Sequence, residues 1–160
     1  MKLPRIILLA SAIFSCTASQ SQARLMSVLS YQELLDKSDL VVIAAPLTRT
    51  ADTTERAFLP NIFRQDKDGK QIQIGAIGVE TAFKSAAVLK GDKTVEQFVL
   101  HHYREAEPPD VELNGPFLVS FDPSHPGFYL LFLIRETDGR FAPAGGQTDP
   151  GFRAISALPP

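Results

Sequence analysis

Three histidines are the side chains of this chain best suited to acid–base or metal chemistry. His101 and His102 are adjacent, and adjacent side chains on a β-strand point to opposite faces. The pair therefore cannot ligate one metal ion together in a simple geometry. His125 lies in a turn flanked by prolines, where a solvent-exposed imidazole is expected.

A candidate site centres on His102. Tyr103 and Arg104 follow it in a predicted strand, and Glu80 lies in a second strand that could bring its carboxylate nearby. An imidazole, a carboxylate and a guanidinium in one pocket would support hydrolysis or metal-assisted chemistry if their pKa values were perturbed. The alternative is that these side chains fill a strand or its surface and carry no chemistry.

The sequence shows no motif for nucleophilic catalysis or for cofactor binding. It contains no G-x-S-x-G and no phosphate-binding loop, so we expect no cofactor. The turn Asp66–Gly69 lacks the ligand spacing of a calcium loop. Four carboxylates between positions 105 and 112 share one proline-rich loop, where solvation is expected. A single cysteine excludes an intrachain disulfide and a cysteine-based zinc site.

The first residues have the three-part pattern of a bacterial-type secretory signal. Lys2 and Arg5 form a basic start, residues 6–14 are an uncharged apolar run, and small side chains follow. The run is too short to cross a bilayer permanently. We therefore expect residues 1–23 to be a signal peptide and residues 24–160 to form a single β-barrel-like domain.

The position of Cys16 leaves the processing of this leader open. A lipoprotein signal ends in a small-residue box whose cysteine is acylated, and Ser15 before Cys16 fits that pattern while bulky Phe14 fits it poorly. Ordinary cleavage after Ala23, or after Ala18, is the alternative. The protein is thus expected to be periplasmic or secreted, with a lipid anchor on Cys16 as one outcome.

The charge of the processed chain argues against a nucleic-acid partner. Removing Lys2 and Arg5 from the 16 basic residues leaves 14 against 18 acidic residues, a net charge of −4. Nucleic-acid binders normally carry a cationic excess. No later apolar run is long enough to span a membrane, because residues 128–134 have only the length of a buried strand. The expected partner is an envelope or extracellular protein, or a small ligand.

A short helix is predicted ahead of the strands. Ser30 and Glu33 form a capping box, and the helix would run from Tyr31 to Lys37 with Leu34 and Leu35 facing inward.

Short apolar or alternating segments separated by turns then predict a mainly β fold. We expect strands at residues 40–47, 70–77, 79–83, 94–103, 117–121, 128–135 and 141–143, with a final segment at 152–158. Residues 57–64 read as a strand or a short apolar excursion, and Gly78 is expected at a bulge. Polar loops are expected at 48–56 and 104–116. Turns at such short intervals favour a small closed or partly open antiparallel barrel, and closure would protect its strands from edge pairing.

Eleven phenylalanines and no tryptophan characterise the aromatic content. OB barrels can stack ligand rings on exposed aromatics. Phenylalanine has no polar tip to hold at a wet surface, so most of these rings are expected in the core.

An ordered set of segments resembles the netrin-like and TIMP-like group of OB-fold domains. The segments are residues 38–44 (SDLVVIA), 79–84 (VETAFK), 88–91 (VLKG) and 128–133 (FYLLFL). The resemblance covers roughly residues 38–143 and is strongest to bacterial exported proteins of this group that have no assigned function. It implies the OB fold, so the expected architecture is a small antiparallel OB-like barrel with a short N-terminal helix. The group's metalloproteinase inhibitors ligate the protease zinc through a disulfide-tied N-terminal cysteine, and Cys16 does not match that residue.

Two functions therefore stand side by side. The first is an exported, non-enzymatic binding or interaction module that contacts its partner through a barrel face or through loops 48–56 and 104–116. The alternative is an envelope hydrolase or metal-assisted enzyme using His102, Glu80 and Arg104. Fold alone does not choose between them, because one fold hosts many functions.

Overall fold

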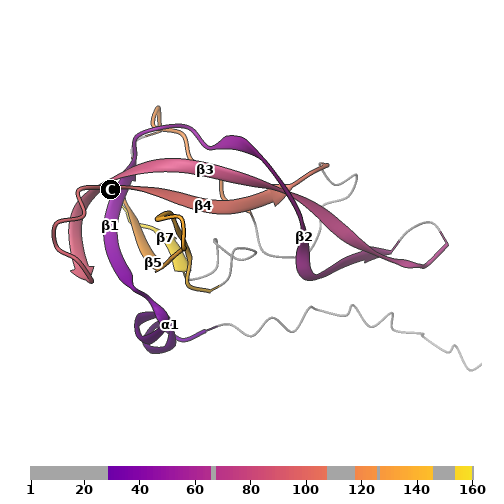
Figure 1. Cartoon of the computed structure of the whole chain (residues 1–160), viewed down its shortest axis with the longest axis horizontal. Coiled ribbons are helices and arrows are strands. Elements are labelled where there is room, and N and C mark those ends of the chain that lie inside the picture. The colour runs from indigo at the N-terminus through magenta and orange to yellow at the C-terminus, as the bar shows by residue number, and fades with distance from the viewer. Residues whose placement is uncertain (1–28, 66–67, 108–117, 126, 146–153, 160) are drawn as a thin grey trace, which may run out of the picture.

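A seven-stranded sheet and one short helix make up the part of the chain that the computed structural model describes, which is residues 29–65, 68–107, 118–125, 127–145 and 154–159. The elements in chain order are α1 (Tyr31–Lys37), β1 (Leu40–Pro46), β2 (Ala51–Gln65), β3 (Gln71–Lys90), β4 (Gln97–Glu105), β5 (Tyr129–Arg135), β6 (Phe141–Pro143) and β7 (Ile155–Ala157). The predicted mainly β fold with a short N-terminal helix is confirmed (Figure 1).

Five of these strands close into a small barrel. Their order is β1-β3-β4-β6-β5, and β5 pairs back with β1 from Leu40↔Leu133 to Ala44↔Tyr129. The β4–β6 contact is parallel, whereas the other pairs are antiparallel. Closure removes exposed edges from these strands. The predicted OB-like barrel is consistent with this arrangement, to which β7 adds along β5 and β2 along β3.

Aromatic rings fill the barrel interior. Phe83 is fully buried, its ring stacked on Phe98 with centroids 5.5 Å apart. Phe121 and Tyr129 present edges to it at 4.9 Å and 6.3 Å. Such edge-to-face pairs add to the stabilisation from area burial alone. Among the described phenylalanines the core expectation is confirmed for five, Phe83, Phe98, Phe121, Phe132 and Phe141, whereas Phe58, Phe63 and Phe128 are exposed.

Strand β4 has buried side chains on both faces, which is why its sequence pattern could not identify the inner one. Phe98, Leu100 and His102 alternate toward the barrel interior. His101 points to the outer face, yet it is only 2% exposed. Neighbouring polar side chains from other elements cover it, as described below.

Helix α1 has the predicted bounds and the predicted cap. The backbone N–H of Glu33 donates to Ser30 Oγ over 3.2 Å, and the Ser30 N–H donates to the Glu33 carboxylate over 2.7 Å. Leu34 packs on Val41 and Phe132, outside the barrel. The prediction that Leu35 also faces inward is wrong: it is 37% exposed, because so short a helix buries one stripe only.

Two predicted loops and one predicted strand are also corrected. Residues 48–56 were expected to be a loop, but β2 begins at Ala51. Threonine-rich polar sequence is tolerated there because β2 lies outside the closed barrel. The loop expected at 104–116 is strand as far as Glu105. A strand was expected at 117–121, but residues 118–121 have no ladder pairing and Phe117 lies outside the described residues. Phe121 is nevertheless joined to Thr50 by two hydrogen bonds.

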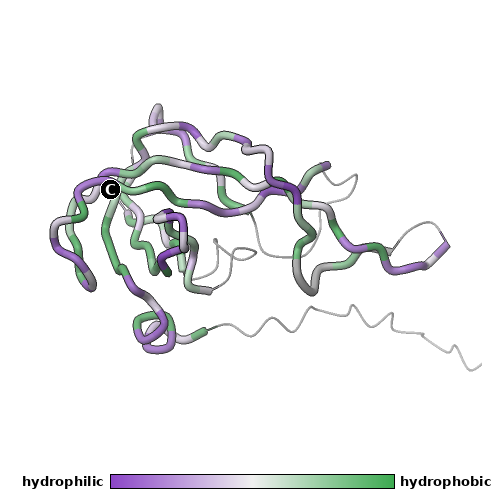
Figure 2. The backbone as a smooth tube through the Cα atoms, viewed as in Figure 1, coloured by the Kyte–Doolittle hydropathy of each residue, from purple (hydrophilic) through white to green (hydrophobic). Residues whose placement is uncertain are grey.

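Strands β2 and β3 continue beyond the barrel as a two-stranded arm, in which Phe58 pairs with Gly75 and residues 63–65 pair with 71–73 (Figure 1). In Figure 2 hydrophobic colour follows most of β1 and reappears on the arm. One face of the arm is a small cluster of Leu59, Ile74 and Ala76, against which Tyr103 and Leu118 pack. The arm is therefore anchored to the barrel at its base.

Candidate functional site

The four residues proposed around His102 do not form one site. His102 faces the barrel interior, whereas Tyr103 and Glu80 lie on the outer face of the β3–β4 ladder. Arg104 instead pairs with Asp52 of β2, its Nε donating to Oδ1 over 2.7 Å. Glu80 accepts a hydrogen bond from Arg140 over 2.6 Å. The alternation of β4, which predicted opposite faces for neighbouring residues, separates the proposed group.

His102 is a buried imidazole in apolar surroundings. It is fully buried, and neither ring nitrogen has a hydrogen-bond partner within the described residues. The rings of His102 and Phe121 pack edge to face, with their centroids 5.7 Å apart. Burial, with the adjacent His101 as a second cause, lowers the pKa of His102 to about 4. The ring is therefore neutral at neutral pH.

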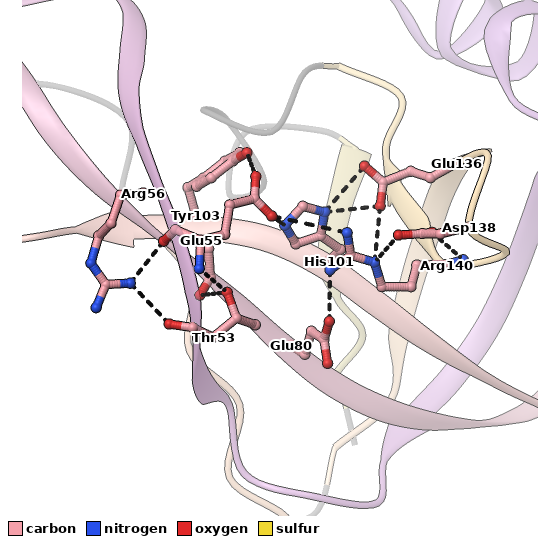
Figure 3. Close-up of polar contacts among 10 residues, drawn as sticks. Thr53, Glu55, Arg56, Glu80, His101, Tyr103, Glu136, Asp138 and Arg140 are labelled. Atoms are coloured by element: carbon pink, nitrogen blue, oxygen red, sulfur yellow. Dashed lines mark hydrogen bonds and ion pairs between the residues drawn. The ribbon is translucent and has the colours of Figure 1, made fainter.

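A polar network on the outer face contains the residue that sequence reasoning set aside, His101 (Figure 3). Its Nδ1 lies 2.8 Å from Oε2 of Glu136, which follows β5, and 3.1 Å from Oε1. Its Nε2 lies 3.1 Å from Oε2 of Glu55 on β2. The ring is thus held between two carboxylates that are far apart in the sequence.

An irregularity in β2 carries Glu55 to this position. The β2–β3 register shifts between Asp52 and Arg56, and Thr53 Oγ1 donates to the Gly78 carbonyl over 2.9 Å. A Cβ on Gly78 would meet Thr53 Oγ1 at 2.9 Å and the Glu55 Cβ at 3.0 Å. Bulges commonly re-aim a side chain in this way. The prediction of a bulge at Gly78 is therefore wrong in its strand: the bulge lies in β2, where β2 crosses over this glycine.

Arg140 supplies the positive charge of the network. It follows the turn that starts at Glu136, where the Glu136 N–H donates to the Arg140 carbonyl over 2.8 Å. Its guanidinium lies 2.6 Å from Glu80, 2.8 Å from Asp138, 3.6 Å from Glu136 and 3.9 Å from Glu55. Arg140 therefore contacts every carboxylate of the network.

Tyr103 completes the network as a hydrogen-bond donor. Its hydroxyl donates to Glu55 Oε1. Burial raises the pKa of Tyr103 to about 12, and the hydrogen bond to Glu55 adds to the shift. The hydroxyl therefore keeps its proton at physiological pH, and Glu55 is shared between Tyr103 and His101.

The network joins elements rather than presenting an open reaction centre. Both nitrogens of His101 face carboxylates, and its side chain is only 3% exposed, so neither nitrogen is presented to a substrate as a general base requires. Within the described ranges no group of three or more His, Cys, Asp or Glu residues has the geometry to hold a metal ion. The arrangement is suited to fixing β2 and the β5–β6 turn onto β4.

His125 is exposed, as expected, in a turn organised by Asp122. Ser124 donates from both its N–H and its hydroxyl to Asp122 Oδ1, over 2.9 Å and 2.7 Å. The Ser124 hydroxyl is 3.3 Å from His125 Nδ1, and Arg49 pairs with Asp122 at 3.0 Å. The serine, not the histidine, lies between the other two groups, which is not the order of a hydrolytic triad.

Several expectations remain predictions. Cys16 and the leader lie outside the described residues, as do Asp110 and Glu112, two of the four carboxylates expected in the loop after β4. Among the described helices, none has the length and apolar character needed to cross a membrane.

No protein-family model, no curated protein and no solved structure matches this chain.

Proposed function

We propose that this protein is an exported, non-enzymatic interaction module that contacts another protein through the aromatic face of its β2–β3 arm, which we define by Phe58 and Phe63. The observation that carries the proposal is their exposure. Phe58 is 62% and Phe63 is 45% exposed, on a ribbon that extends away from the barrel (Figure 1).

The arm supports this role because its exposed aromatic rings lie on the face opposite to its apolar cluster. Phe58 and Phe63 pair with Gly75 and Gln73 of β3. These β3 residues are two positions apart and share a face, so the two rings do too. The Leu59–Ile74 cluster occupies the opposite face. A two-stranded ribbon has marginal stability in water, and a partner packed on the aromatic face would complete a layer over it.

Side chains, rather than the backbone edge of β2, are the favoured means of contact. The β2–β3 register is interrupted twice, between Asp52 and Arg56 and again between Phe58 and Phe63. Pro60 lies inside the second interruption and lacks an N–H. Bulges and prolines are the devices that discourage strand addition at an edge. Exposed aromatic rings, in contrast, are typical anchors at the centre of protein interfaces.

Charge favours an acidic rim around the partner's apolar patch. Residues 56–70 contain four basic and two acidic residues, a net charge of +2, whereas the remainder of the chain has a net charge of −4. Complementary potentials raise association rates and select partners. We therefore expect an envelope protein whose apolar patch is bordered by Asp and Glu; a second copy of this chain is the competing occupant that the test must distinguish.

Site-specific photo-crosslinking tests the proposal. A benzoylphenylalanine replaces Phe58 or Phe63 in the exported protein, and Leu89, which is 54% exposed, serves as the control position. We expect one adduct of the same mass from positions 58 and 63 and none from 89. Equal adducts at all three positions, or none at any, would overturn the proposal. An adduct formed by the purified protein alone would identify a second copy instead.

Export has its own test. Mass spectrometry of the protein from the envelope or medium is expected to show a chain that starts at Arg24 or Ser19, or one that starts with an acylated Cys16. Export through a cleaved leader is contradicted if exported material retains Met1.

A further inference from the structure

We infer that His101 is a proton-controlled latch that fixes the irregular segment of β2, at the base of the arm, to the barrel. The inference rests on the geometry of the His101 ring and does not depend on what the arm contacts. Glu136 faces Nδ1 at 2.8 Å and Glu55 faces Nε2 at 3.1 Å.

The chemistry of imidazole makes this arrangement sensitive to one proton. A neutral imidazole carries one N–H and one lone pair, whereas an imidazolium carries two N–H groups. Only the charged ring can therefore face both Glu55 and Glu136 favourably. Loss of the proton leaves a lone pair against a carboxylate, and one of the two contacts must open.

The contact that opens is the one to Glu55. Nδ1 is within hydrogen-bond distance of both oxygens of Glu136, whereas the approach of Nε2 to Glu55 is an ion-pair contact without well-directed hydrogen-bond geometry. The remaining proton therefore stays on Nδ1.

Groups from every element around the ring set the balance. Glu55 belongs to β2, Glu80 to β3 and Tyr103 to β4, while Glu136, Asp138 and Arg140 belong to the β5–β6 turn. Arg140 neutralises part of the acidic charge in either state of the ring, and Tyr103 keeps its hydrogen bond to Glu55. Deprotonation thus loosens β2 without releasing it.

The loosened segment is a short one. The β2–β3 ladder pairs Asp52 with Val79 and resumes at Arg56 with Ile77, so residues 53–55 lie between two pairing points. Glu55 is the side chain that ties this segment across β3 to β4. We expect the segment, and the arm that continues from it, to be held when His101 is charged and to move more freely when the pH rises and the ring becomes neutral.

Nuclear magnetic resonance of the folded protein tests the latch. Ring ¹⁵N shifts of His101 and the amide shifts of residues 53–56 are recorded across a pH titration. We expect both ring nitrogens to carry protons at the acidic end, and the amides of 53–56 to shift in the same step in which the ring loses a proton. Amides that do not follow the ring, or a ring with a single N–H at every pH at which the protein is folded, would overturn the inference.

A matched pair of variants separates the latch from a purely structural contact. In Glu55→Gln the amide can accept from a protonated Nε2 or donate to a neutral one, so the step in the 53–56 amides is lost while the His101 step remains. Asp52→Asn is the control. It removes a carboxylate from the same strand, but this carboxylate binds Arg104 rather than His101, so the coupled step should persist. A step unchanged in Glu55→Gln refutes the latch; if that variant does not fold, the wild-type ring shifts decide alone.

Discussion

At the scale of the residue, two positions have roles that depend on the absence of a side chain or of a charge. Gly78 leaves the space that Thr53 and Glu55 occupy as β2 crosses β3. His102 packs as a neutral ring against Phe121. In both cases the neighbours, rather than the residue type alone, determine the role.

Gly78→Ala is expected to destabilise the protein by about 1–3 kcal/mol, because the added methyl overpacks a space bounded by another strand. Gly75→Ala is the matched control. Its Cβ would make an ordinary contact of 3.6 Å with the Ala106 Cβ, and alanine loses less chain entropy than glycine on folding. Urea unfolding measures both. Equal stabilities of the two variants would show that β2 does not cross tightly over Gly78.

His102 is expected to make the fold sensitive to acid. The unfolded chain takes up this proton near pH 6.5, whereas the folded protein does so only near pH 4. The unfolded state therefore binds more protons between these values, and stability falls by about 3 kcal/mol as the pH drops through that window. Above pH 6.5 the His102 ring is neutral in both states, and the full stability of the fold is present.

His102→Leu removes this ionisation together with two buried nitrogens that lack partners. Urea midpoints measured from pH 7 to pH 4 are expected to fall less in the variant than in the wild type. The same fall in both proteins would show that another group causes the acid sensitivity.

At the scale of the element, local sequence identified the structures whose stability is local. The capping box of Ser30 and Glu33 uses backbone groups within three residues, so the bounds of α1 were predictable. The long apolar run of β5 indicated a buried strand in the same way. These signals do not depend on how distant parts of the chain meet.

Tertiary pairing determined the elements that sequence reasoning missed. β2 begins with polar residues that are exposed or half-exposed, and it is a strand because it pairs with β3. The candidate site failed for a related reason. His101 looked like one of two equivalent histidines, and nothing local indicated that Glu55 and Glu136 would cover it. Gly78 was the available signal, but the bulge that it indicates lies in β2, opposite the glycine, and not in β3.

Ser30→Ala tests the local origin of α1. We expect a loss of about 1 kcal/mol in the stability of the helix, because the Glu33 N–H loses its acceptor. Gln32→Ala, which removes only an exposed contact with Asp36, should cost a few tenths of a kcal/mol at most. Amide exchange at Leu34, whose N–H donates to the Ser30 carbonyl, reports both. Identical exchange in the two variants would argue that packing alone holds the helix.

At the scale of the whole molecule, the closed barrel provides the packed core and the extended arm provides the surface proposed to bind a partner. The barrel concentrates its aromatic rings around Phe83. The arm instead exposes two rings, and its contacts with Tyr103 and Leu118 in the described part of the chain lie at its base. We therefore expect core substitutions to affect folding and arm substitutions to affect binding.

Phe83→Ala is expected to lower the free energy of unfolding by about 3–5 kcal/mol, since it removes a fully buried ring that three other rings contact. Phe128→Ala is the control, because that ring is 51% exposed. Denaturant unfolding monitored by circular dichroism measures the difference. Similar losses in the two variants would be incompatible with a barrel packed around Phe83.

The affinity of the purified protein for the partner captured at positions 58 and 63 tests the central proposal most directly. Phe58→Ala should weaken binding at least tenfold, about 1.4 kcal/mol, as expected for a buried aromatic anchor. It should leave the free energy of unfolding nearly unchanged. Leu89→Ala should bind as the wild type does. Wild-type affinity in Phe58→Ala, or an equal loss in Leu89→Ala, would contradict recognition through the aromatic face of the arm.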